Sequence, residues 1–390
     1  MIWQKLLWNK ILKTKPPIIN RQACFNNKIN RYNNKKECRK CADNCPHNAI
    51  KLSHRGIYLN AEECTGCGNC ISICPTNAIT TSDINYNKKF RELCALTNPV
   101  LGCYWVNSEV DFSFPCLYSI GQDFWQAYFI EQVKRNGEIN LYLGRCHFCD
   151  NFKNYPFFIR FIKNARLLVE DMGFEENLSI NGLFSEPQLK EKRTENKQEE
   201  NLGNVSRREL FSSIRRETTE TFRELTSEIL TDKHKYFKGS ATFNQERAVF
   251  LNSLRSVANF SVRAKTGLKI AWLNIDTDCN GCGICVKNCD NKALVKEQGH
   301  NGYENLIFIK QRPWLCIDCG TCRYTCPHNA IVKSSFQNFI INLFNERTLA
   351  NLVVKGCIHC GNDRVFHSYL QDKTVTDKCS SCRKKERIEF

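Results

Sequence analysis

The chain has 390 residues, 42% of them hydrophobic, and a formal net charge of +16. No run of about 18 apolar residues occurs, so we expect no transmembrane segment. Twenty-five residues are cysteine, and most of them stand at C-x2-C spacing. In the absence of a secretory signal, this spacing favours metal ligation in a reducing, cytoplasmic setting over a disulfide framework.

Changes of composition divide the chain into segments. Residues 1–20 are amphipathic, which predicts a helix that packs on the core or docks on a partner, with peripheral membrane contact as the alternative. Residues 185–201 contain almost no apolar residues and predict a charged, disordered linker. Apolar residues at helical intervals predict a helical segment over 205–262. The cysteines fall in four further segments, which we expect to fold as domains: 21–85, 94–183, 270–334 and 355–385.

Two matching ladders of cysteine stand in the segment 270–334. They are Cys279, Cys282, Cys285 and Cys289, and Cys316, Cys319, Cys322 and Cys326, and Pro327 follows the last. Three thiolates two residues apart can bind three corners of one iron-sulfur cubane, whereas the fourth cysteine faces the other cube. The pattern resembles the bacterial dicluster ferredoxins. This resemblance implies one [4Fe-4S] cluster on Cys279, Cys282, Cys285 and Cys326, and another on Cys316, Cys319, Cys322 and Cys289. Asp290 departs from the family pattern, in which a proline is usual.

The segment 21–85 repeats this pattern with one cysteine missing. Cys64, Cys67, Cys70 and Cys74 form a complete ladder, but the other ladder has only Cys38, Cys41 and Cys45, and Lys35 stands at its leading position. Cys24 is the unassigned cysteine nearby. It precedes Cys38 by about fourteen residues, and a loop of that length closes at modest entropic cost. We therefore predict one cluster on Cys24, Cys38, Cys41 and Cys74, and one on Cys64, Cys67, Cys70 and Cys45. The alternative is a labile three-cysteine site.

A repeated hexapeptide marks the ends of these ladders. "CPHNAI" occurs at 45–50 and again at 326–331, and "CPTNAI" begins at Cys74. We interpret each copy as the end of a cluster loop. Its cysteine is the fourth of a ladder, and we call it the crossing cysteine because it faces the other cluster of the module. The residues after it lead into the ferredoxin core. Four cubanes with their thiolates carry roughly two negative charges each, and a four-cysteine zinc site, which the tail predicts, adds about two more. The net charge then falls to about +6. We therefore do not expect a nucleic-acid partner.

The segment 94–183 has a different pattern. Strands are expected over 110–120 and 138–146, and helices over 122–137 and 156–173, which predicts a small parallel sheet with covering helices. The layout resembles the delta subunit of methyl-viologen-reducing hydrogenases. This resemblance implies a [2Fe-2S] cluster on four cysteines: Cys103, Cys116, Cys146 and Cys149. A zinc site and metal-free cysteines are the alternatives, and Cys94 is expected to be a buried thiol.

The tail contains two C-x2-C knuckles formed by Cys357, Cys360, Cys379 and Cys382. This spacing predicts a zinc ribbon, with a rubredoxin-like iron site as the alternative. The fold class is thus α+β multidomain: two ferredoxin-like 2[4Fe-4S] modules, a small α/β parallel-sheet domain and a zinc ribbon.

No nucleotide-binding loop occurs, and no catalytic residue can be named. We expect a polyferredoxin that relays electrons to or from a partner oxidoreductase. The alternatives are thiol or sulfur chemistry at the middle-domain cysteines, and a regulator that binds nucleic acid through the zinc ribbon.

Overall fold

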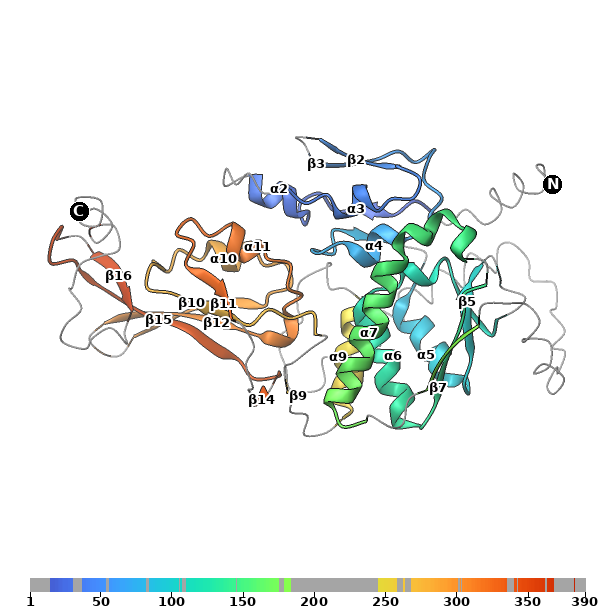
Figure 1. Cartoon of the computed structure of the whole chain (residues 1–390). Coiled ribbons are helices and arrows are strands. Elements are labelled where there is room, and N and C mark those ends of the chain that lie inside the picture. Colours follow the sequence, from blue (N-terminus) through green and yellow to red (C-terminus); the bar gives the residue numbers. More distant parts are fainter. Residues whose placement is uncertain are drawn as a thin grey trace, which may run out of the picture. The chain divides into compact units, whose positions relative to one another are not determined.

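The protein is described here from a computed structural model (Figure 1). The predicted segments 185–201 and most of 1–20 and 205–262 lie outside the described residues, as does Cys379. None of the helices in the described part is long and apolar enough to cross a membrane. The structure describes residues 15–30, 37–53, 56–81, 84–104, 106, 110–144, 146–174, 179–183, 245–257, 262–263, 268–300, 302, 304–334, 340–341, 343–361, 363–367 and 382.

The first module is a compact pair of cysteine loops closed by short strands. Strand β1 (Ile18–Ile19) pairs antiparallel with β4 (Ile79–Thr80), and β2 (Ile50–Ser53) forms a hairpin with β3 (Gly56–Leu59). Each loop contains a short helix, α3 (Lys40–Asp43) or α4 (Asn69–Ile73). One more helix, α2 (Phe25–Asn30), is inserted directly after Cys24.

The second module repeats the same order of elements without the inserted helix. Strand β10 (Leu273–Ile275) pairs antiparallel with β13 (Ile331–Lys333), and β11 (Leu294–His300) forms a hairpin with β12 (Asn305–Gln311). The loop helices are α10 (Ile284–Lys287) and α11 (Thr321–Tyr324). Isoleucine and leucine side chains of these strands belong to a buried core against which cysteines of both loops pack.

The chain after the second module extends its hairpin. Strand β15 (Arg347–Gly356) pairs antiparallel with β12, and β16 (Asp363–His367) pairs with β15, which gives a four-stranded antiparallel sheet in the order β11-β12-β15-β16 (Figure 1). Ala350 and Leu352 of β15 belong to the core of the second module. The strand that leads to the first tail knuckle is thus built on the second module.

The middle domain contains the predicted parallel sheet, in the order β6-β5-β7-β8. Its strands are β5 (Val100–Cys103), β6 (Phe112–Phe114), β7 (Glu138–Tyr142) and β8 (Ser179–Leu183), and all neighbours run parallel. Its helices are α5 (Tyr86–Ala95), α6 (Gln122–Lys134), α7 (Tyr155–Asp171) and α9 (Gln245–Arg255), which gather on one side of the sheet in Figure 1.

Helix α6 is the centre of this domain because α7, α9 and α5 pack around it. Phe124, Trp125, Tyr128 and Phe129 are fully buried, and such rings bury more apolar surface than other side chains do. Helix α9 lies in the predicted helical segment 205–262, but Val262 at the end of that segment begins a strand, β9 (Val262–Arg263), so the prediction is wrong there.

Candidate iron-sulfur centres

The repeated hexapeptide adopts one backbone conformation at each occurrence. Its asparagine lies in the left-handed region, with φ near +50° at Asn48, Asn77 and Asn329, and Lys292 takes the same conformation at the equivalent place after Cys289. Asparagine tolerates this region better than most residues that carry a Cβ, because its short polar side chain can hydrogen-bond locally. The turn reverses the chain directly after each crossing cysteine.

The alanine that follows this turn joins the two loops of a module. Its carbonyl accepts a hydrogen bond from a backbone amide three or four residues before the leading cysteine of the other loop. The four bonds are Asn20 to Ala78 at 2.8 Å, Asn60 to Ala49 at 2.8 Å, Asp276 to Ala330 at 2.9 Å and Arg312 to Ala293 at 2.8 Å. Each bond brings a crossing cysteine next to the leading cysteine with which it is predicted to share a cluster.

Cys24 occupies the leading position of its loop by this criterion. Asn20, four residues before it, donates its amide to Ala78 and accepts the amides of Gln22 and Ala23 on its side-chain oxygen. Asp276 forms the equivalent turn before Cys279, with its carboxylate accepting the amide of Asp278. The sequence pattern placed Lys35 at this position because it did not reveal the inserted helix.

Helix α2 then returns the chain to the rest of the ladder. The Asn26 side chain forms hydrogen bonds to both backbone groups of Cys38, accepting its amide at 2.7 Å and donating to its carbonyl at 2.9 Å. Burial raises the pKa of the Cys24 thiol, and the charges of Cys74 and Cys38 raise it further. Burial likewise raises the pKa of Cys41 to about 12, with contributions from Cys74, Cys38 and Cys24. The structure therefore brings these four side chains, the Cys24 group, together.

The second set of the first module is the Cys64 group: Cys45, Cys64, Cys67 and Cys70. Burial raises the pKa of Cys67 to about 11, and Cys45 and Cys64 add to the increase. Cys70 has a pKa well above its usual value, chiefly through burial, with Cys67, Cys64 and Cys45 adding to it. Cys41 of the Cys24 group also acts on Cys70, so the two groups are electrostatic neighbours.

The second module contains the Cys279 group (Cys279, Cys282, Cys285 and Cys326) and the Cys316 group (Cys289, Cys316, Cys319 and Cys322). Burial raises the pKa of Cys285 to about 12, with Cys279, Cys282 and Cys326 adding to it. Burial has the same effect on Cys316, where Cys319 and Cys289 contribute. The two groups also meet each other, because Cys285 acts on Cys322.

These donor sets fit iron-sulfur cubanes. A buried set of four thiolates without a metal would suffer both desolvation and mutual repulsion, and bound iron removes both costs. Backbone amides already point at several sulfurs: Ala78 donates to Cys74 Sγ at 3.2 Å, Ala293 to Cys289 Sγ at 3.3 Å and Ala271 to Cys316 Sγ at 3.4 Å. Amide hydrogen bonds of this kind tune the reduction potential of a bound cluster.

The middle-domain cysteines form a fifth set, the Cys103 group. Cys103 ends β5, Cys116 follows β6, and Cys146 and Cys149 follow β7, so all four stand at the carboxyl ends of three adjacent parallel strands. Burial raises the pKa of Cys116 well above its usual value, and Cys67, Cys103 and Cys146 contribute. Burial raises the pKa of Cys146 to about 11, and the charges of Cys103 and Cys149 add to the increase. Cys94 lies outside these sets and is half-buried.

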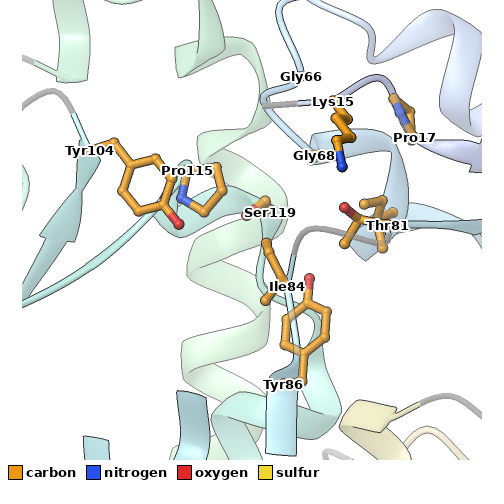
Figure 2. Close-up of a pocket in the computed structure, with 11 residues that line it drawn as sticks. Lys15, Pro17, Gly66, Gly68, Thr81, Ile84, Tyr86, Tyr104, Pro115 and Ser119 are labelled. Carbon is orange, nitrogen blue, oxygen red and sulfur yellow. The ribbon is translucent and has the colours of Figure 1, made fainter. Parts of the chain in front are cut away.

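The Cys64 loop and the middle domain meet closely. Ser72 Oγ donates to the Tyr118 carbonyl at 2.8 Å, and a Cβ on Gly68 would lie 2.9 Å from Ser119 Cβ. Gly68 has φ +76°, so only glycine meets both the conformational and the steric demand without strain. Figure 2 shows the pocket beside this contact, lined by Gly66, Gly68, Tyr86, Tyr104 and Ser119 among others.

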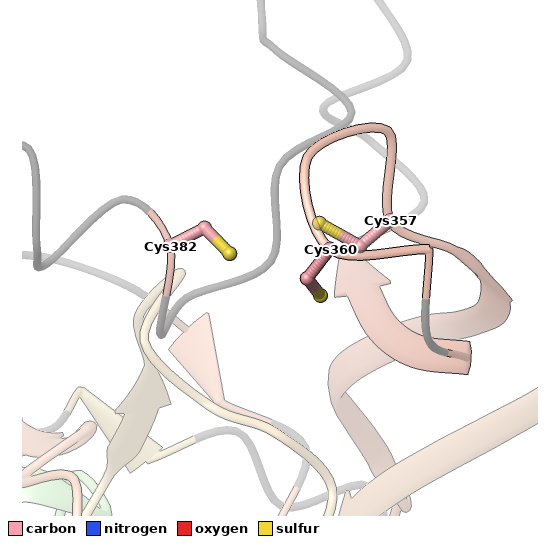
Figure 3. Close-up of side chains that lie close together, drawn as sticks. All are labelled: Cys357, Cys360 and Cys382. Atoms are coloured by element: carbon pink, nitrogen blue, oxygen red, sulfur yellow. The ribbon is translucent and has the colours of Figure 1, made fainter.

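Three of the four predicted tail ligands lie together. The sulfurs of Cys357, Cys360 and Cys382 are all within 4.8 Å of one another (Figure 3). Cys357 and Cys382 are buried. Three convergent thiols can hold a metal ion, and tetrahedral zinc would require one further ligand.

Comparisons with known proteins bear on the two modules. Residues 36–78 match the model of a 4Fe-4S dicluster domain, and residues 278–331 match a second model of the same description. The chain contains two ferredoxin-type domains. The predicted duplication is thereby confirmed, whereas Cys24 precedes the first matched stretch and residues 79–277 lie between the two. The ligand assignments and the resemblance of the middle domain to the hydrogenase delta subunit stay predictions.

Three relatives each share a short stretch with this chain. The ferredoxin-type protein NapF of Haemophilus influenzae is 49% identical over 57 residues, which are 13% of this chain and 32% of that protein. NapF of Escherichia coli is 47% identical over 49 residues, 11% of this chain and 30% of that protein. A component of an ion-translocating oxidoreductase complex of Methanosarcina acetivorans is 43% identical over 42 residues, 11% of this chain and 16% of that protein. The chain thus spans less than a third of the length of each of these relatives.

Proposed function

We propose that this protein relays electrons between partner redox proteins through four [4Fe-4S] clusters. The observation that carries the proposal is the sorting of sixteen cysteines into four groups of four, each completed by a cysteine from the other loop of its module. The expected ligands are the Cys24, Cys64, Cys279 and Cys316 groups. When bound, such clusters accept and donate single electrons, and the surrounding sulfur hydrogen bonds and burial set their potentials.

Within a module, the structure favours rapid exchange between the two clusters. Cys41 acts on Cys70 across the first module, and Cys285 acts on Cys322 across the second. Ligands close enough for this interaction keep the two clusters of a module near one another. A partner oxidoreductase and a cytoplasmic setting are part of the proposal. The C-x2-C spacing of the cysteines, which favours metal ligation in a reducing compartment, supports the second of them.

Metal analysis of the anaerobically purified full chain tests this function. Iron, acid-labile sulfide and zinc are measured per chain, and the dithionite-reduced sample is examined by EPR. About 16 irons, with EPR signals of reduced cubanes, are expected from four clusters. An iron content well below 12, with zinc making up the difference, would refute the relay.

We further propose that the Cys103 group holds a fifth metal centre. Its support is the convergence of four cysteines at the carboxyl edge of the parallel sheet, where ligands of open α/β sheets bind. Burial raises the pKa of Cys146 to about 11, which opposes formation of a thiolate at this cysteine in the absence of a metal. An iron content of about 18 would assign a [2Fe-2S] cluster. A second zinc per chain would assign a zinc site. If the protein contains neither the two extra irons nor a second zinc, these cysteines bind no metal.

For the tail, we propose a zinc site on Cys357, Cys360 and Cys382 with Cys379 as fourth ligand. The clustering of the first three sulfurs supports it. Its test is the zinc content of a Cys357→Ser variant, which should fall by about one ion per chain while the iron content stays unchanged.

A further inference from the structure

Two departures from the ferredoxin pattern meet at one contact. The first module carries the inserted helix α2 after Cys24, and the second carries Asp290 directly after Cys289. Lys28, in α2, forms an ion pair with Asp290 at 2.5 Å and donates to the Asn288 carbonyl at 2.8 Å. Lys28 is only 5% exposed, although lysine is seldom buried without a partner.

A second contact fixes the same two modules next to each other. Phe25, which follows Cys24, packs edge-to-face on Tyr324, with ring centroids 5.5 Å apart and an interplanar angle of 83°. Tyr324 lies in the Cys316 loop, between Cys322 and Cys326. Residues that follow Cys24 in the sequence therefore contact residues that follow Cys289 and Cys322, which are two predicted ligands of the Cys316 group.

These contacts define which groups face each other between the modules. We infer that α2 and Asp290 form a single junction, which holds the cluster of the Cys24 group beside that of the Cys316 group and makes this the crossing point for electrons. The inference rests on the proposed relay function. Together with the contacts described above, it orders the sites in one row: the Cys103, Cys64, Cys24, Cys316 and Cys279 groups.

The junction also places a charge beside the Cys316 group. The Lys28 ammonium lies beside the Cys289 ligand, because it pairs with Asp290 at 2.5 Å and donates to the Asn288 carbonyl at 2.8 Å. A cation beside a cluster stabilises the reduced form, which carries one more negative charge, and Asp290 opposes this effect. Lys28 is thus a positioning residue that also raises the potential of the Cys316-group cluster.

Potentiometric titration followed by EPR tests this on the full chain. Lys28→Met should lower one midpoint, with the equilibrium constant for reduction of that cluster falling about tenfold, which is about 59 mV for one electron. Asp290→Asn should raise the same midpoint. Lys310→Met, which removes the ion pair with Glu297 at 2.5 Å on the hairpin of the second module, is the matched control and should change none. Unchanged midpoints in both junction variants, or shifts of equal sign, would overturn the charge role.

A spin-coupling experiment tests the crossing point separately. Replacing Cys64 and Cys67, and also Cys279 and Cys282, by serine removes the two outer cubanes, so the clusters left in the modules are those that face the junction. Their fully reduced EPR spectrum should show splitting or broadening from interacting spins. Two non-interacting signals at about eight irons would overturn the junction. Wild-type protein without cubanes would instead refute the relay function itself.

Discussion

Replacing Cys24 by serine gives the sharpest test of the site assignment. The structure places this side chain at the leading position of its loop, where it is 5% exposed. The variant keeps Cys38, Cys41 and Cys74, which is one thiolate fewer than a cubane with four cysteine ligands requires. We expect the iron content to fall from about 16 to about 12 per chain.

The fold of the first module should survive this change. Serine has nearly the same shape, and the Asn26 hydrogen bonds to Cys38 and the ion pair of Lys28 hold α2 in place independently of the sulfur. The assay is iron and sulfide analysis with EPR after anaerobic purification. The matched control is Cys94→Ser, because Cys94 is half-buried and lies outside all cysteine groups. An unchanged iron content in Cys24→Ser would refute the assignment, and so would an equal loss in the control.

Three further predictions concern the packing around the clusters. Burial raises the pKa of Glu246 from 4.5 to about 7, so the folded protein binds a proton here more tightly than the unfolded chain does. The stabilisation from this proton is lost as the pH rises from 4.5 through 7. The stability that Glu246→Gln gains over wild type in denaturant unfolding should therefore be about 1 kcal/mol larger at pH 8 than at pH 6. Arg247, 1% exposed, pairs with Asp123 at 2.9 Å and donates to the Cys316 carbonyl at 2.6 Å. Arg247→Leu should cost about 3–5 kcal/mol, and the double variant with Asp123→Leu less than the sum of the two single changes. Gly68→Ala should speed chelator-driven loss of the Cys64-group cluster, with Gly173→Ala, where a Cβ meets nothing within 4 Å, as the control of equal φ demand.

Much of the ferredoxin part could be predicted because its information is local. C-x2-C spacing fixes three ligands within one loop, and the asparagine of the hexapeptide supplies the turn that follows the crossing cysteine. Helices α6 and α7 were predicted for the same reason, since each follows a continuous apolar pattern. Strands β5 and β8 were missed because they are short and lie among residues without period-two alternation.

The remaining features depend on residues far apart in the sequence. The pairing of Lys28 with Asp290 joins positions 262 apart, and no local pattern links them. Asp290 was noticed as a departure from the family, but its partner could be found only once α2 was seen to occupy the insertion. The pairing of β15 with β12 was missed likewise, because it extends a hairpin after an intervening segment.

The exposure of the cysteines agrees with a row that electrons traverse from end to end. Cys149 of the Cys103 group is exposed, and its neighbour Phe148 is 80% exposed, which offers a partner an apolar contact close to one end. Cys282 of the Cys279 group is exposed at the other end. In the Cys24 group, by contrast, Cys24, Cys41 and Cys74 are buried. Electron transfer slows as the distance between donor and acceptor grows, and a buried cluster is held far from the cofactor of a partner. We therefore expect partners to exchange electrons at the two ends, and the junction to serve transfer inside the protein.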